Sequence, residues 1–103
     1  MKMPEHVSVL LREAVEYLNI RPDGLYVDAT LGGGGHSEAI LQKLSQGRLI
    51  GLDQDDYALD RARTRLGGYA NFLAVKANFA DLAATIQSLG ISGVDGILYD
   101  LGV

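Results

Sequence analysis

The chain has 103 residues, of which 48% are apolar and 21% charged, a composition typical of one globular domain rather than of a disordered or fibrous protein. No run of about 18 apolar residues is present and the first residues lack an apolar stretch, so we expect neither a membrane span nor a signal peptide. The absence of cysteine excludes a disulfide framework and thiolate chemistry and fits a cytoplasmic protein, and the net charge of −4 argues against a compact nucleic-acid-binding module.

The first half of the chain contains two predicted helices and one strand between them. Apolar residues recur at helical spacing over residues 8–18, and the turn residues 22–24 follow. Residues 25–29 form a short apolar strand, which leads into four consecutive glycines at 32–35. Helical spacing returns over residues 36–44, and we expect Gly47 to end that helix with a positive φ.

The second half continues the alternation of strand and helix. We predict a strand at 48–53, a helix that begins at Asp55 or Asp56 and ends at Leu66, a strand at 72–75, a helix at 80–89 and a strand at 94–100. Strand and helix thus alternate four times, which predicts an α/β fold of the Rossmann-like, doubly wound type with helices on both faces of a parallel sheet. The strands are continuous apolar runs, as burial on both faces requires.

Three of the predicted strands end in an acidic residue: Asp28, Asp53 and Asp100. In open parallel sheets, ligands bind outside the carboxyl ends of the strands. The three carboxylates are therefore the strongest functional signal in the chain.

The four glycines between the first strand and the next helix have two interpretations. They could form only a tight turn, or they could let a ligand approach the backbone closely. Four in a row are more than a turn needs, which favours a ligand. A phosphate-binding P-loop is excluded because no Gly-Lys-Ser/Thr follows, and the dinucleotide pattern fits badly because Ser37 stands where its third glycine belongs.

Asp53 and Asp100 each have a functional and a structural interpretation. An acid about 20 residues past a glycine loop accepts hydrogen bonds from the ribose hydroxyls of a bound adenosine. Asp53 could instead cap the next helix, but Asp55 and Asp56 are available for that role and would leave Asp53 free. Asp100 could accept a hydrogen bond from a substrate N–H or a cofactor amine, or could cap a loop.

Two further polar residues lie near these strand ends. His36 opens the helix beside the expected ligand, whereas Asp95, at the start of the last strand, is expected on the opposite rim in a structural role. With two histidines and no cysteine, we predict no metal site.

Residues 26–37, which end in Gly-Gly-Gly-Gly-His-Ser, resemble the cofactor loop of the bacterial 16S ribosomal RNA (cytosine-N4)-methyltransferase family. The segments 9–11, 19–24, 78–82 and 95–103 resemble that family as well, so the likeness spans the whole chain. The resemblance implies a class I methyltransferase fold with strand order 3-2-1-4 and S-adenosyl-L-methionine as the cofactor.

The family resemblance also implies a role for six residues. By position, Gly34, Gly35 and His36 would contact the methionine end of the cofactor, Asp53 the ribose, Phe79 the adenine, and Asp100 the methionine amine and the transferred methyl group. Asp100 is accordingly the candidate catalytic residue, since a carboxylate there could also accept an N–H of the amine that is methylated.

The implied reaction is methylation of the exocyclic N4 amine of a cytidine in the 16S ribosomal RNA of the small subunit. Members of that family are longer, so residues 1–103 are expected to be the N-terminal part of the cofactor-binding domain, truncated after the fourth strand and with little activity alone. The later strands and an inserted helical region that helps to hold RNA would be missing. The exposed edge of the fourth strand would then favour a homodimer or other self-association. The alternatives are a nicotinamide- or nucleotide-binding module of the same fold and a fragment that binds neither.

Overall fold

The structure is a computed structural model that describes residues 15–32 and 34–99. Residues 15–18 are helical, as predicted, and the earlier part of the first predicted helix lies outside the described residues. The other elements are β1 (Leu25–Asp28), α2 (Gly35–Leu41), β2 (Arg48–Asp53), α3 (Asp56–Leu66), β3 (Phe72–Lys76), the short 3₁₀ turn η1 (Phe79–Asp81), α4 (Leu82–Ser88) and β4 (Gly96–Leu98).

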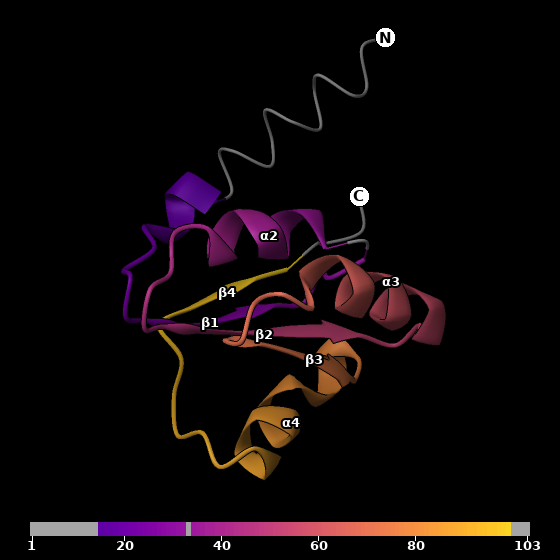
Figure 1. Ribbon diagram of the computed structural model, residues 1–103. Helices are drawn as coiled ribbons and strands as arrows, with labels where there is room; N and C mark the ends of the chain where they lie inside the picture. Colours follow the sequence, from indigo (N-terminus) through magenta and orange to yellow (C-terminus); the bar gives the residue numbers. More distant parts are fainter. Residues whose placement is uncertain (1–14, 33, 100–103) are drawn as a thin grey trace, which may run out of the picture.

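The four strands form one parallel sheet in the order β3-β2-β1-β4, which confirms the predicted fold class and strand order. Helices α2 and α3 cover one face of the sheet and α4 lies on the other (Figure 1). The two central strands are buried along nearly their whole length, because helices cover both of their faces.

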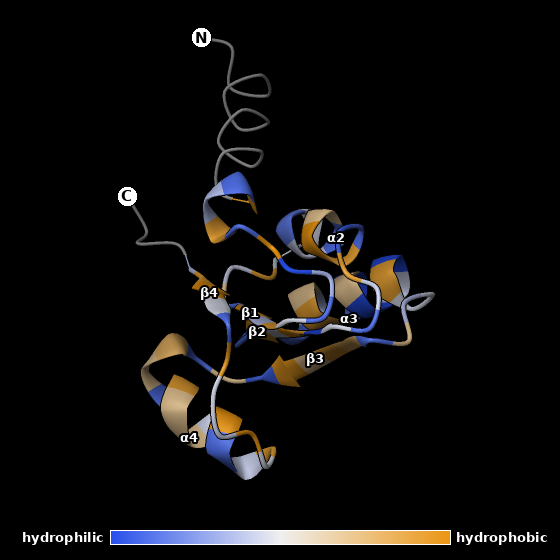
Figure 2. Ribbon diagram, turned by 90° about the vertical axis from the view of Figure 1, so that its left-hand side faces the viewer, coloured by the Kyte–Doolittle hydropathy of each residue, from blue (hydrophilic) through white to orange (hydrophobic). Residues whose placement is uncertain are grey.

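Neighbouring residues of each central strand supply two different cores. In β1, Tyr26 packs on the side of α2, whereas Val27 packs on the side of α4. In β2, Leu49 and Ile50 divide in the same way. This division follows from the alternation of side chains along a strand. Figure 2 shows the mostly hydrophobic strand β3 with α4 on one side of it and α2 and α3 on the other.

The bounds of helix α3 agree with the prediction. Asp55 is its N-cap, and the carboxylate accepts a hydrogen bond from the backbone N–H of Tyr57 at 3.1 Å. The helix ends at Leu66, and its buried face consists of Leu59, Ala62 and Leu66.

The end of helix α2 and the role of Gly47 differ from the prediction. The helix ends at Leu41 instead of residue 44, and Gly47 does not have a positive φ. Gly47 instead lies against the turn before β1, where its N–H donates to the carbonyl of Pro22 at 2.9 Å. A Cβ at Gly47 would lie 2.3 Å from the carbonyl oxygen of Gly24, so close contact between two backbone segments requires glycine here.

The last helix and strand are also shorter than predicted. The helical segment begins as the 3₁₀ turn η1 and continues as α4, which ends before Gly90 with its φ of 76°. Within the described residues, strand β4 covers only Gly96–Leu98, which are in register with Tyr26–Asp28 of β1.

We expect Gly47→Ala to destabilise the chain by about 2–3 kcal/mol, since the new methyl group would overlap rigid backbone that cannot move aside. Gly68→Ala is the matched control, because a Cβ at Gly68 meets nothing within 4 Å. Urea unfolding of the two variants measures the difference. Equal stability of both variants would show that the turn before β1 can move away from residue 47 with little loss of folding free energy.

Candidate functional site

The carboxyl ends of the strands lie along one edge of the sheet, since all four strands run parallel. From β1 the chain passes through α2 to β2, whereas β4, which follows α4, pairs with the other side of β1. The strand order therefore reverses at β1, and the glycine loop lies at the end of that strand. This reversal is the usual place for a ligand in an open α/β sheet.

Asp28, the last residue of β1, is fully buried and organises the start of the glycine loop. Its Oδ1 accepts hydrogen bonds from the backbone N–H of Thr30 at 2.8 Å and from the Thr30 hydroxyl at 2.6 Å. Its Oδ2 accepts a hydrogen bond from the Ser37 hydroxyl at 2.7 Å. A buried carboxylate needs such partners, and here they join β1, the loop and α2.

Sequence reasoning noted Asp28 only as one of three acids at strand ends and missed this network. The hydroxyl residues on either side of the glycines, Thr30 and Ser37, were the available signal, because a buried acid requires donors nearby.

Two of the glycines are required by the geometry of the loop itself. Gly32 and Gly34 have φ values of 49° and 94°, a region that residues with a Cβ rarely adopt. A Cβ on Gly34 would also lie 3.2 Å from the side chain of Leu66. The tight-turn interpretation thus accounts for these two glycines.

Gly35 differs from both of these glycines. It is the first residue of α2, its φ is not positive, and a Cβ there would meet nothing nearer than the Arg65 guanidinium at 4.0 Å. Among the described residues, neither backbone strain nor packing requires glycine at this position, so they leave its backbone accessible to a ligand. Gly33 lies outside the described residues.

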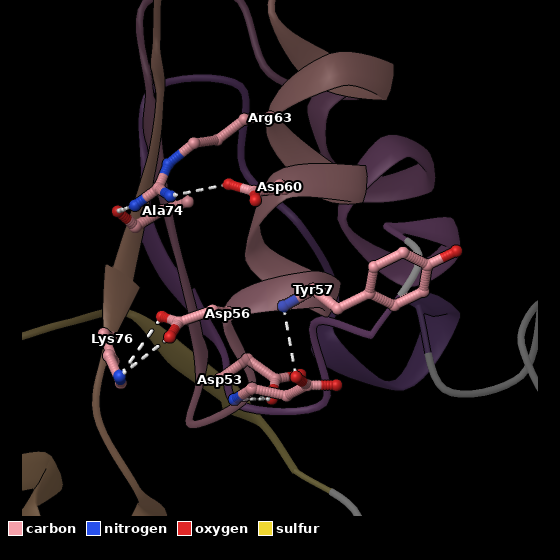
Figure 3. Close-up of polar contacts among 8 residues, drawn as sticks. Asp53, Asp56, Tyr57, Asp60, Arg63, Ala74 and Lys76 are labelled. Atoms are coloured by element: carbon pink, nitrogen blue, oxygen red, sulfur yellow. Dashed lines mark hydrogen bonds and ion pairs between the residues drawn. The ribbon is translucent and has the colours of Figure 1, made fainter.

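Asp53, at the end of β2, binds two backbone amides. Its Oδ2 accepts from Gly32 N–H at 3.1 Å, and its Oδ1 accepts from Asp55 N–H at 2.9 Å. Figure 3 shows Asp53 beside the first turn of α3, where Lys76 of β3 pairs with Asp56. Asp55 does cap α3, as predicted, but the expectation that Asp53 would then be left free is wrong.

The hydrogen bonds from these two backbone amides still leave Asp53 able to bind a ligand. A carboxylate has about four lone-pair sites, so the group can accept further hydrogen bonds. The amides also fix its orientation, which reduces the entropy that it would lose on binding.

A cavity of about 290 Å³ opens beside Asp53 at the carboxyl ends of the strands. Both the segment after β3 and the glycine loop contribute to its lining. Its lining residues are Ala29, Thr30, Gly32, Leu52, Asp53, Gln54, Ala77, Asn78 and Phe79.

Phe79 is 48% exposed, and its ring stacks on Tyr99, with 4.7 Å between the ring centroids. Two of the predicted site residues, Asp53 and Phe79, therefore line one cavity.

The predicted residues Gly34, Gly35 and His36 do not line this cavity. Gly34 is the N-cap of α2, and Gly35 and His36 are its first two residues. Nδ1 of His36 is 3.3 Å from the hydroxyl of Thr30, which does line the cavity. Asp100 lies outside the described residues, directly after Tyr99. Asp95 is at the opposite rim, as expected, and binds Arg21 and the backbone N–H of Leu25.

Across residues 15–32 and 34–99, no helix has both the length and the apolar character needed to cross a membrane. Over the same residues, histidine and acidic side chains do not gather in a group of three or more that could hold a metal ion.

Comparisons with known proteins place the chain in a family. The model of the MraW methylase family matches residues 3–103. Ribosomal RNA small subunit methyltransferase H of Brevibacillus brevis is 58% identical over 100 residues, which cover 95% of this chain and 32% of that protein. Ribosomal RNA small subunit methyltransferase H 1 of Acholeplasma laidlawii is 52% identical over 99 residues, which cover 96% of this chain and 33% of that protein. The chain thus spans about a third of the length of these curated relatives.

A solved structure supports the same fold. An rRNA methylase from Streptococcus thermophilus superimposes with a TM-score of 0.69 at 21% identity, over 93% of this chain and 54% of that one. The family resemblance of the sequence motifs and the methyltransferase fold class are thereby confirmed. The chain belongs to the MraW methylase family.

Proposed function

We propose that residues 1–103 form the N-terminal part of the cofactor-binding domain of an RNA methyltransferase that uses S-adenosyl-L-methionine. The proposed reaction is methylation of the N4 amine of a cytidine in 16S ribosomal RNA, and the proposed location is the cytoplasm. The relatives' names support the ribosomal RNA of the small subunit as the substrate. The observation that carries the proposal is the cavity that Asp53 and Phe79 share at the carboxyl ends of the strands.

The adenosine end of the cofactor is proposed to occupy this cavity. Asp53 offers lone pairs to the two ribose hydroxyls while the amides of Gly32 and Asp55 hold it in place. Phe79 offers a half-exposed ring to the adenine, and such ring contacts are favourable without being specific. The carboxylate acceptor and the aromatic face match the hydroxyl groups and the base of an adenosine.

The methionine end is proposed to contact the turn formed by Gly34, Gly35 and His36. The open space at Gly35 supports this placement, since a Cβ there would cover backbone that no group among residues 15–32 and 34–99 covers closely. When bound, the cofactor supplies an activated methyl group on a sulfonium, so the chain's task is to bind and orient it. Asp100 is proposed to lie next to the methionine amine, from which it accepts a hydrogen bond, and next to the transferred methyl group.

The amine of cytosine is a weak nucleophile because its lone pair is shared with the ring. A carboxylate that accepts a hydrogen bond from one N–H group of this amine helps to localise that lone pair. This is the catalytic role proposed for Asp100. The segments by which the relatives exceed this chain are proposed to hold the RNA, so that the 103 residues alone have little activity.

Cofactor titration tests the proposal against a nicotinamide-binding module of the same fold. Isothermal titration should show that S-adenosylhomocysteine, the product of methyl transfer, binds and that NAD does not. Binding of NAD alone would establish the alternative module. Binding of neither compound would indicate a fragment without cofactor affinity.

We expect Gly35→Ala to weaken S-adenosylhomocysteine binding by about tenfold or more while folding stability stays equal or rises. Alanine is the better helix former, by about 0.5–1 kcal/mol, and the site has room for its methyl group. Isothermal titration and urea unfolding measure the two effects. Gly93→Ala is the control, because a Cβ there meets nothing within 4 Å. Unchanged affinity in Gly35→Ala would restore the tight-turn interpretation.

Self-association through β4 is also proposed. Within the described residues β4 pairs only with β1, which leaves one edge of its backbone unpaired. Its side chains are partly covered, because Ile97 and Leu98 pack against the cores on the two faces of the sheet. Sedimentation equilibrium should show a dimer at tens of micromolar, with slow amide exchange over residues 96–98. A monomer in which these amides are equally protected would contradict the proposal.

A further inference from the structure

The hydroxyl of Thr30 lies between a buried carboxylate and a histidine ring. Its Oγ1 is 2.6 Å from Oδ1 of Asp28 and 3.3 Å from Nδ1 of His36. Thr30 and His36 are both only partly buried, so the chain of contacts runs from the core at Asp28 towards the surface at the start of α2.

Counting donors assigns the direction of each hydrogen bond. The Asp28 carboxylate receives three of them, from Thr30 N–H, Thr30 O–H and Ser37 O–H. A threonine hydroxyl has one proton, and here that proton is donated to the carboxylate. Towards His36 the same oxygen can only accept, so Nδ1 of His36 must carry a proton.

We propose that Thr30 is a positioning residue that holds neutral His36 in the tautomer protonated at Nδ1, with Nε2 as a hydrogen-bond acceptor. Neutral histidine in water prefers the opposite tautomer, with its proton on Nε2. The hydrogen bond of one ring nitrogen decides which nitrogen is protonated, so the Asp28–Thr30 pair reverses that preference. Nε2 lies on the far side of the ring from Thr30, and none of the residues that the structure describes forms a hydrogen bond with it.

This tautomer selects the chemistry of the group that His36 can bind. An unprotonated Nε2 accepts a hydrogen bond from an N–H group and cannot donate one to a carboxylate. On the proposed function, on which this step rests, His36 therefore receives a hydrogen bond from the α-amino group of the cofactor's methionine end rather than binding its carboxylate.

Ring ¹⁵N NMR of the 103-residue chain tests the tautomer without any ligand. At pH about 9, where an ordinary histidine is neutral, Nδ1 of His36 should give a protonated signal and Nε2 an unprotonated one. His36→Gln identifies the signals, because His6 is the one other histidine in the sequence. A wild-type ring protonated at Nε2 would overturn the proposal.

Variants of Thr30 test whether its hydroxyl is the cause. Thr30→Val keeps the shape of the side chain but not the acceptor, so the His36 proton should move to Nε2. Thr30→Ser keeps the hydroxyl and should retain the wild-type tautomer. If the folded Thr30→Val chain keeps the proton of His36 on Nδ1, the role of Thr30 is contradicted. Should that variant not fold, the role of Thr30 is contradicted instead if His36 in the Thr30→Ser chain has a different tautomer from the wild type.

A ligand pair tests the second step separately. Against the wild-type chain, S-adenosylhomocysteine should bind about tenfold or more tightly than its analogue without the α-amino group, and Thr30→Val should reduce that ratio. Equal binding of the two compounds overturns the amino-group assignment. If neither binds while Nδ1 carries the proton, the proposed function fails and the tautomer assignment stands.

Discussion

Asp53→Ala should weaken the binding of S-adenosylhomocysteine by about 2–4 kcal/mol, a loss of affinity of roughly 30- to 900-fold. The substitution removes the two charge-assisted hydrogen bonds that we propose to the ribose, and it also frees the amides of Gly32 and Asp55 that Asp53 holds. Isothermal titration of the variant and the wild type gives the difference directly.

Asp56→Ala is the matched control for this experiment. It removes the same charge three positions along the chain, but Asp56 is exposed, pairs with Lys76 and is not among the residues that line the cavity (Figure 3). Its loss should change affinity by less than about 1 kcal/mol. If Asp53→Ala binds as tightly as Asp56→Ala, the ribose assignment is wrong.

Asp28→Ala should destabilise the fold by about 3–4 kcal/mol, a large part of the stability of a domain of this size. The change leaves the Thr30 N–H and the Thr30 and Ser37 hydroxyls without their acceptor at a site where Asp28 is 0% exposed. It also removes the anchor that joins β1 to the start of α2. Urea unfolding measures the effect.

Asp95→Ala provides a comparison within the same strand pair. Asp95 accepts hydrogen bonds from Arg21 and from the first amide of β1, but it is exposed, so water can replace these partners. We expect a cost of about 1 kcal/mol or less. Equal losses for the two variants would mean that the buried network around Asp28 adds nothing beyond an ordinary surface contact.

The sequence determined the local elements and their order. Strand β2 and helix α3 have the predicted bounds, because a continuous apolar run, a helical apolar face and an aspartate N-cap are signals contained within a dozen residues. The alternation of strand and helix determined the parallel sheet, and family resemblance supplied its strand order. The parallel sheet in turn placed Asp28 and Asp53 at one edge, so the location of the candidate site was also predictable.

The tertiary structure alone decided what these side chains contact. The partners of Asp53 include the amide of Gly32, which is distant in sequence, and no local pattern encodes such a bond. Gly47 was read as a helix end because glycine often has that role, yet its reason is contact with the backbone of Gly24. In the sequence Asp28 is one of three acids at strand ends, whereas in the structure it is fully buried and accepts three hydrogen bonds from Thr30 and Ser37. Hydrogen-bond partners and steric contacts depend on which segments meet in space, and folding determines that only when the whole sheet has formed.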